Sequence, residues 1–398
     1  MKRRKEYGQW LARGPWLVLI LVGGCQTGGP TSKEQAQQSW NDQRAALKCE
    51  LASAELQTGR VDKAVNLARE AVGLSPDQPG HAVLLARAYL ARGDFAAARR
   101  VLQRIQKLHP EFGPASYLLG TICEREQHWK GAIESYGRAI EAEPDQIDYL
   151  IALAQAVAQT GDYAAARAVL DDRSENFEAE PAYHLAYAEI CQRAADLPAA
   201  CQAYERVLRL GIDDLGVRTS LGLCLYWMGR PAASLEYLNK VVREKGEIAP
   251  AVMCAYTGAL IKTGATGPAA EWLRRFTDQR PDVAQLWLLT AEVHSLLGEL
   301  EVATSAVRRA VRLEGDSPDV LLIAATVYLR AGDVEAAEKA VQRVLRQVPN
   351  NVDALIIHGR TCEHRGDKAA AAEAYQAAWD LEQCELASEL LARLSRVD

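Results

Sequence analysis

The sequence predicts an all-α protein, a right-handed superhelical solenoid of about ten helical hairpins followed by a C-terminal capping helix. Three observations lead to this fold class. Small residues recur at a constant interval, and apolar residues follow helical spacing on two successive segments of each interval. The prolines of the array also avoid the helix interiors that this register implies, where each would cost about 3 kcal/mol.

The interval between equivalent small residues is 34, with a single interval of 35. A second small residue stands twelve positions before each, from Ala52 in the first period to Gly359 in the last. Because helix axes approach closely only where side chains are small, this pair of positions predicts a helical hairpin in every period. The first set is Ala64, Ala98, Ala132, Ala166, Ala200, Ser234, Ala269, Ala303, Ala337 and Ala371.

The turn inside each period carries its own signal. Gly stands five positions before the ladder residue in eight periods, with Gln127 and Ala195 in the other two. Gly readily adopts the left-handed conformation that ends a helix, and an Asp such as Asp94 then caps the next one. In the fourth period Arg173 occupies a position for a small or apolar residue, so we expect the second helix to end early, near Asp171.

In its length and motif the period resembles the tetratricopeptide repeat (TPR), with small residues at repeat positions 8 and 20, Gly at 15 and Pro at 32. The resemblance covers residues 45–385 and is strongest around Trp129-Lys130-Gly131-Ala132. It implies first helices that line a concave, ligand-binding face. The ten expected repeats are 45–78, 79–112, 113–146, 147–180, 181–214, 215–249, 250–283, 284–317, 318–351 and 352–385.

The N-terminus has the pattern of an export signal. A basic segment precedes a short apolar run that ends in Val22-Gly23-Gly24-Cys25. This junction resembles the bacterial lipobox, which implies a thioether-linked diacylglycerol on Cys25, cleavage after Gly24, and a further acyl chain such as palmitate on the new amine. We therefore expect a lipoprotein signal peptide at 1–24, and the lipidated Cys with a flexible polar tether at 25–44. The alternative is an uncleaved signal anchor in which Cys25 is incidental.

Two further helices are expected at the ends of the array. Ser32 with Gln35 has the spacing of a capping box, so a helix that runs from there into the first repeat is possible. Residues 386–398 are expected to form the capping helix. The side chains expected to cover the last repeat are Leu386, Leu390, Leu391 and Leu394.

Composition and motifs exclude several classes of function. The formal net charge of −6 disfavours binding to nucleic acid. The sequence contains no phosphate-binding loop, nucleophile elbow or paired Cys-x-x-Cys, and the repeats leave no room for a catalytic domain. We expect a protein that is not an enzyme and has no cofactor or metal. His358 and Cys362 lie four residues apart, but they fit core positions of the last repeat better than a metal site.

The cysteines other than Cys25 fit best as small buried side chains. Disulfides remain an alternative in an exported protein. Cys191 and Cys201 flank the turn of one hairpin, so they are the pair that the sequence favours for a possible disulfide.

A second stripe, at positions 2, 5, 9 and 12 of each first helix, is expected to face a ligand. Position 9 is never Asn, so the carboxylate clamp known in the family is not supported. The stripe is most apolar near the middle of the array. Alternatively, Tyr226 and Trp227 pack between neighbouring first helices. The candidate partner-binding residues are Tyr117, Leu223, Tyr226, Trp227, Ile261 and Leu288.

Together these features predict a non-enzymatic, lipid-anchored scaffold of the cell envelope. It would face the periplasm, from the outer rather than the inner membrane, because Gln26 replaces the Asp that signals inner-membrane retention. Its partners would be proteins or peptides in a secretion, pilus or envelope-assembly complex, with no nucleic acid and no small-molecule cofactor. The alternative is a periplasmic binding subunit that presents a peptide or glycan to a separate enzyme.

Overall fold

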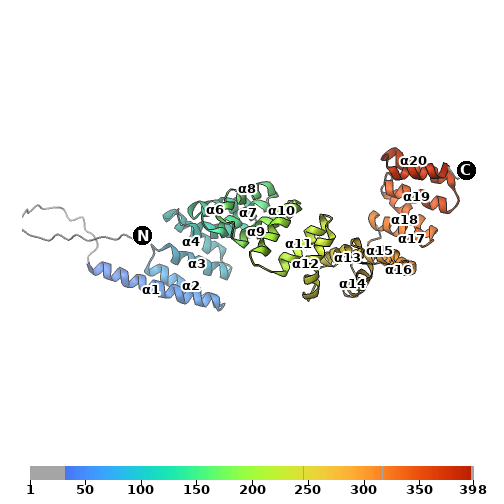
Figure 1. The fold of residues 1–398 in the computed structure, drawn as a ribbon. Coiled ribbons are helices and arrows are strands. Elements are labelled where there is room, and N and C mark those ends of the chain that lie inside the picture. The colour runs from blue at the N-terminus through green and yellow to red at the C-terminus, as the bar shows by residue number, and fades with distance from the viewer. Residues whose placement is uncertain (1–31, 245, 316, 396–398) are drawn as a thin grey trace, which may run out of the picture. The chain divides into compact units, whose positions relative to one another are not determined.

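The computed structural model describes residues 32–244, 246–315 and 317–395, and every regular element in these ranges is helical (Figure 1). The expected signal peptide and Cys25 lie outside the described residues. The chain divides into two compact units, residues 1–122 and 123–398, and each is described by itself. Within the described ranges, no helix is both long and apolar enough to cross a membrane.

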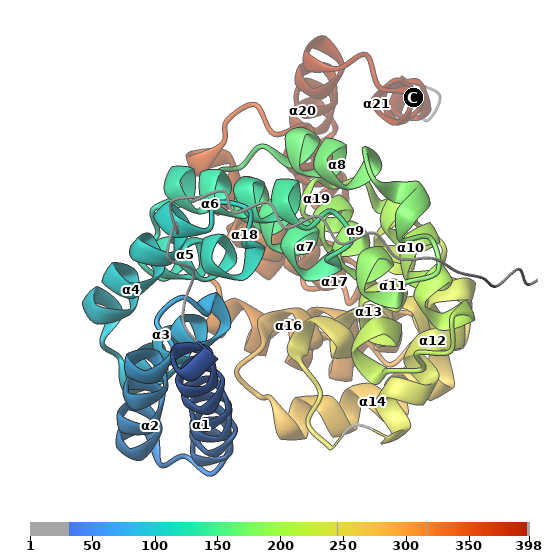
Figure 2. The ribbon, with the colours of Figure 1, turned by 90° about the vertical axis from the view of Figure 1, so that its left-hand side faces the viewer.

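The first unit begins with a long helix that packs beside its successor (Figure 2). The hydroxyl of Ser75 donates to Asp42, with 2.5 Å between the oxygen atoms, and Lys48 pairs with Glu70. Because this first helix begins at Ser32, residues 32–44 are helical. This corrects the expected flexible tether over these residues in favour of the helix from Ser32. The helices are α1 (Ser32–Gln57), α2 (Val61–Leu74), α3 (Pro79–Arg92), α4 (Phe95–Leu108) and α5 (Gly113–Arg125), which runs into the second unit.

The second unit continues as a stack of helical hairpins, in which each helix packs on the next one along the chain. The all-α solenoid architecture expected from the periodicity is confirmed. Its α-helices are α6 (Trp129–Ala142), α7 (Ile147–Gln159), α8 (Tyr163–Asp171), α9 (Pro181–Arg193), α10 (Leu197–Arg209), α11 (Leu215–Trp227), α12 (Pro231–Glu244), α13 (Pro250–Lys262), α14 (Thr266–Gln279), α15 (Ala284–Leu296), α16 (Leu300–Leu313), α17 (Pro318–Arg330), α18 (Val334–Gln347), α19 (Val352–His364), α20 (Lys368–Leu381) and α21 (Glu385–Ser395).

The recurring small residues bring the two helices of a hairpin together. A Cβ on Gly222 of α11 would overlap the side chain of Leu238 on α12. The buried hydroxyl of Ser234 donates to the carbonyl oxygen of Gly222, with 2.7 Å between the two oxygen atoms. At this hairpin the two small residues therefore allow the helices to approach closely, and the buried hydroxyl of Ser234 still has a hydrogen-bond partner.

The turns follow the chemistry expected of them. Gly93 has a φ of +82°, and the carboxylate of Asp94 then accepts a hydrogen bond from the backbone nitrogen of Ala97 over 3.0 Å. The two turns without Gly keep the same left-handed geometry, with φ of 57° at Gln127 and 60° at Ala195. These two side chains carry a conformational strain that Gly would avoid.

Helix α8 is short, as Arg173 led us to expect. It ends at Asp171 after 9 residues, whereas α10 has 13. A 3₁₀ turn at Ser174–Asn176 follows, and Phe177 turns inward and is buried. The second helix of this hairpin therefore lacks its last turn, which uncovers part of α9.

Helix α21 packs against α20 at the end of the unit (Figure 2). Ala387 and Leu390 are buried there, and Leu391 and Leu394 pack on the same cluster. Leu386 was expected to join them but is 43% exposed, because the buried register of α21 begins one residue later, at Ala387.

Candidate functional site

The second unit contains an apolar groove of about 570 Å³ that crosses three successive first helices, α15, α17 and α19. Neighbouring first helices pack beside one another, so equivalent side chains line up across the stack. Leu288, Leu322 and Ile356 hold the same repeat position on these three helices and form the floor of the groove. The exposed Leu386 of α21 lies at its end.

Two aliphatic side chains stand exposed beside this floor. Leu296 is 56% exposed at the end of α15, and Ile323 is 38% exposed on α17. An exposed Leu is unremarkable alone, but two beside a continuous apolar floor form a patch that a partner can cover.

Charged side chains frame the groove. Glu292 on α15, Thr326 on α17 and Arg360 on α19 occupy the same repeat position, so this row runs from an acid to a base. Arg330 adds a second guanidinium at the end of α17. Among the residues that the structure describes, neither Arg330 nor Arg360 forms an ion pair. Both cations are therefore free to pair with a ligand.

Family models match most of the helical array. A model described as tetratricopeptide repeat matches residues 40–121 and 125–190, and one described as the cytochrome c-type biogenesis protein H TPR domain matches 272–383. The chain is a tetratricopeptide-repeat protein. Repeats of this kind mediate protein–protein interactions, and all the lining residues of the groove of this TPR protein except Leu386 lie within the segment 272–383. No curated protein matches the chain in sequence.

Solved TPR structures resemble the chain at low identity. The C-terminal part of a TPR repeat-containing protein from Cytophaga hutchinsonii is 16% identical, covers 60% of this chain and 98% of its own, and has a TM-score of 0.48. PilW, a type IV pilus biogenesis factor, is 20% identical, covers 52% of this chain and 96% of its own, and has a TM-score of 0.45. Pseudomonas aeruginosa pilF is 15% identical, covers 56% of this chain and 98% of its own, and has a TM-score of 0.45. These similarities concern the fold alone.

The candidate binding residues occupy different environments. Leu288 lies in the groove, with 5% of its surface exposed. Ile261 is buried in the core, and Leu223 is half-buried against that same core. Trp227 is 53% exposed at the end of α11, outside the groove. Tyr117 belongs to the first unit, where it is half-buried. Within the second unit, Leu223 and Ile261 therefore share one apolar cluster, whereas Leu288 and Trp227 lie outside it.

Tyr226 behaves as the packing alternative predicted. Its hydroxyl lies where a Cβ of Gly258 on α13 would have to be, and the Nζ of Lys262 lies 4.7 Å from the centroid of its ring. The partner-binding role proposed for these residues stays a prediction. The groove itself was missed, although three successive aliphatic residues at one stripe position could have indicated it.

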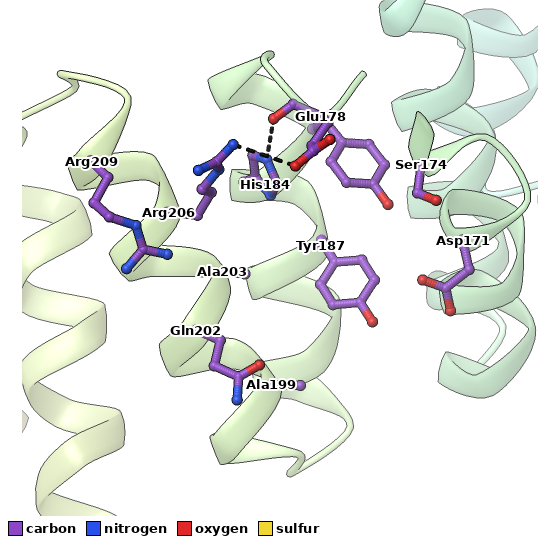
Figure 3. A pocket seen from close by; sticks show the side chains of 11 residues that line it. Asp171, Ser174, Glu178, His184, Tyr187, Ala199, Gln202, Ala203, Arg206 and Arg209 are labelled. Atoms are coloured by element: carbon purple, nitrogen blue, oxygen red, sulfur yellow. Dashed lines mark hydrogen bonds and ion pairs between the residues drawn. The ribbon is translucent and has the colours of Figure 1, made fainter. Parts of the chain in front are cut away.

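A smaller pocket, of about 330 Å³, opens where α8 ends early. Figure 3 shows the hydroxyl of Tyr187 pointing toward Asp171 across it. The Nε2 of His184 lies 2.8 Å from the carbonyl oxygen of Glu178, and the carboxylate of Glu178 pairs with Arg206 over 3.6 Å. Burial raises the pKa of Tyr183, a further wall residue, to about 12. These groups already satisfy one another, which makes this pocket a weaker candidate than the groove.

The expected pair of Cys191 and Cys201 does not form a disulfide in the structure, where both are free thiols. Cys191 is hydrogen-bonded to Tyr187. Cys201 is hydrogen-bonded instead to Cys224 of α11. The two cysteines of this hairpin therefore have different neighbours.

The structure also shows the surroundings of Cys362 and His358, the two residues that the sequence analysis considered as metal ligands. The Sγ of Cys362 lies 4.0 Å from the Nε2 of His358, and Cys362 is buried in the core. Over the described ranges, no three His, Cys, Asp or Glu side chains are grouped closely enough to hold a metal ion.

Proposed function

We propose that this TPR protein is a non-enzymatic scaffold that binds a peptide segment of a partner protein in the groove across α15, α17 and α19. The observation that carries the proposal is the continuous apolar floor flanked by exposed Leu296 and Ile323. Covering one such side chain contributes about 1.5 kcal/mol or more when its surface is fully removed from water. Two or three such side chains would contribute about 3–9 kcal/mol before the cost of association, so a micromolar Kd, about 8 kcal/mol, also needs the charged contacts described next.

The charges give the occupant a direction. A base in the partner segment would face Glu292 on α15, and an acid would face Arg360 on α19. Arg330 reinforces the preference for acidic groups near α19. Charge-assisted hydrogen bonds of this kind fix orientation and register more than they add affinity.

The test is a selection of random displayed peptides on the purified protein. We expect enriched sequences with aliphatic residues between a base and an acid. Ile323→Glu places a charge over the groove floor without opening the core, so a parallel selection on this variant should lose that pattern. Ile212→Glu is the matched control, because Ile212 is 46% exposed outside the groove. Equal enrichment of the same peptides on both variants would reject the groove as the site.

We also propose that the scaffold is anchored in the cell envelope through a lipid on Cys25, facing the periplasm, within a secretion, pilus or envelope-assembly complex. The support is the Val22-Gly23-Gly24-Cys25 junction behind a basic segment. More than one acyl chain is needed for stable anchoring, as lipobox processing supplies. Cys25→Ser should abolish incorporation of labelled palmitate and prevent maturation. Labelling that persists in this variant would remove the anchor from the proposal.

A further inference from the structure

Two cysteines from consecutive hairpins meet inside the second unit. Cys201 lies on α10 and Cys224 on α11, and both are buried in the same apolar cluster. The thiol of Cys224 donates a hydrogen bond to Cys201. The thiol of Cys201 in turn donates to the thioether of Met228, with 3.7 Å between the two sulfur atoms. The Sγ of Cys201 therefore faces the end of α11, where Cys224 and Met228 are one helical turn apart in sequence.

We propose that Cys201 and Cys224 are the site of a disulfide that ties α10 to α11. Because Cys201 shares a buried cluster with Cys224 and contacts Met228 one turn further along, side-chain rotation and a small helix adjustment bring the two sulfur atoms to the bonding distance of about 2.05 Å. Cys191 does not compete for Cys201, because Cys191 is hydrogen-bonded to Tyr187 on its own helix α9. The pairing links two repeats rather than the two helices of one hairpin.

The chemistry of the pair assigns a role to each sulfur. The hydrogen bond from Cys224 lowers the pKa of Cys201, against the opposing effect of burial, and Arg230 lowers it further. The same hydrogen bond and burial raise the pKa of Cys224. Because the thiolate is the nucleophile in disulfide exchange, Cys201 reacts first.

The oxidant is a small disulfide such as oxidised glutathione. The Cys201 thiolate attacks one of its sulfur atoms, which forms a mixed disulfide and releases one glutathione thiolate. Cys224 then gives its proton to solvent or to that thiolate, and its sulfur attacks the Sγ of Cys201. The second glutathione leaves as a thiolate. Two protein thiols are oxidised and one glutathione disulfide is reduced to two thiols.

This inference does not depend on the proposed peptide groove, since α10 and α11 contribute nothing to that groove. An oxidising envelope compartment would favour the disulfide in the cell. The test is done on purified protein, so a failed lipid anchor and a failed disulfide give different results.

The full chain is unfolded in denaturant and refolded in a buffer of oxidised and reduced glutathione, so that burial does not limit access. Remaining thiols are then alkylated, and the protein is digested with trypsin without reduction. The three cysteines fall on separate peptides, Cys191 on 174–193, Cys201 on 194–206 and Cys224 on 219–240. We expect a species in which 194–206 is linked to 219–240, and a midpoint of thermal unfolding several degrees above that of the reduced protein.

Two variants complete the experiment. Cys224→Ser should leave one glutathione on Cys201, because the second step is blocked, and should abolish the thermal shift. Cys191→Ser should change neither result. A link between 174–193 and 194–206, or alkylation of both Cys201 and Cys224 in the refolded protein, would overturn the proposal.

Discussion

The hydroxyl of Tyr226 on α11 fills the space in front of Gly258 on α13. Lys262, one turn further along α13, places its ammonium group over the Tyr226 ring at 4.7 Å from the centroid. A half-buried aromatic residue thus joins one first helix to the next, and the absence of a side chain at position 258 makes the contact possible. The contact is an example of how neighbouring repeats are coupled.

Gly258→Ala is expected to destabilise the protein. The new methyl group would displace the Tyr226 phenol from a well-packed contact, at a cost of about 1–3 kcal/mol. Gly137→Ala is the control, because Gly137 lies within α6 with open space around its Cα. Ala there should stabilise by up to about 1 kcal/mol through helix propensity. Chemical denaturation of both variants decides the matter, and a neutral Gly258→Ala would show that Tyr226 moves freely.

Trp227→Ala and Tyr226→Ala should separate two adjacent aromatic residues. Trp227 is 53% exposed, so its removal should change the free energy of unfolding by less than about 1 kcal/mol, whereas Tyr226→Ala removes a packed ring and should cost about 2 kcal/mol or more. Thermal unfolding measures both. A Trp227→Ala variant that melts as early as Tyr226→Ala would contradict the distinction. Loss of partner binding by a stable Trp227→Ala protein would support its predicted role at an interface.

Most of the fold was predictable because its determinants are local and repeated. The ladder from Ala64 to Ala371 and the turn glycines specify hairpins without any long-range information. Even the short α8 was predicted from one residue, because Arg173 occupies a repeat position where a small or apolar residue is expected. The errors fall at the ends of the array, where the repeat supplies no neighbour. Leu386 and Ala387 are both apolar, and only packing against α20 decides which of them is buried.

Ala195→Gly is expected to stabilise the second unit. Ala195 holds a φ of 60° at the turn between α9 and α10, a conformation that Gly adopts without the steric cost of a Cβ. The gain should be about 0.5–1 kcal/mol, after the greater chain entropy of Gly in the unfolded state is subtracted. Ala194→Gly, one residue earlier and in right-handed geometry, should destabilise instead. Urea denaturation of the two variants should therefore give changes of opposite sign.

The stability of the α10–α11 junction should decrease at acidic pH. Hydrogen bonds from Arg218 and Lys240 lower the pKa of Asp213 to about 2. A carboxylate with a depressed pKa in the folded state contributes stability above its unfolded pKa, and that contribution is lost as the pH falls from about 4 toward 2. Asp213→Asn should therefore lower the melting temperature at pH 7 more than at pH 3. Asp278→Asn, which removes an exposed carboxylate from α14, should show no such difference between the two pH values.

The site was harder to predict than the fold. The groove lies on first helices, where the sequence predicted the ligand stripe, and Leu288 belongs to both. Whether a stripe residue is exposed depends on how far neighbouring helices separate, which the sequence of a single repeat does not specify. Ile261, at position 12 of the stripe, is therefore buried, although the sequence predicted it to face a partner. Which cysteines lie close together was hard to predict for the same reason, since Cys201 and Cys224 meet only through packing between repeats.

The affinity of a selected peptide for three forms of the protein tests the central claim most directly. Isothermal titration should give a micromolar Kd for the wild-type protein and for Ile212→Glu, and a Kd at least tenfold weaker for Ile323→Glu. Circular dichroism should show that all three are equally folded. An unchanged Kd for a folded Ile323→Glu variant would contradict the claim that the groove across α15, α17 and α19 binds the partner.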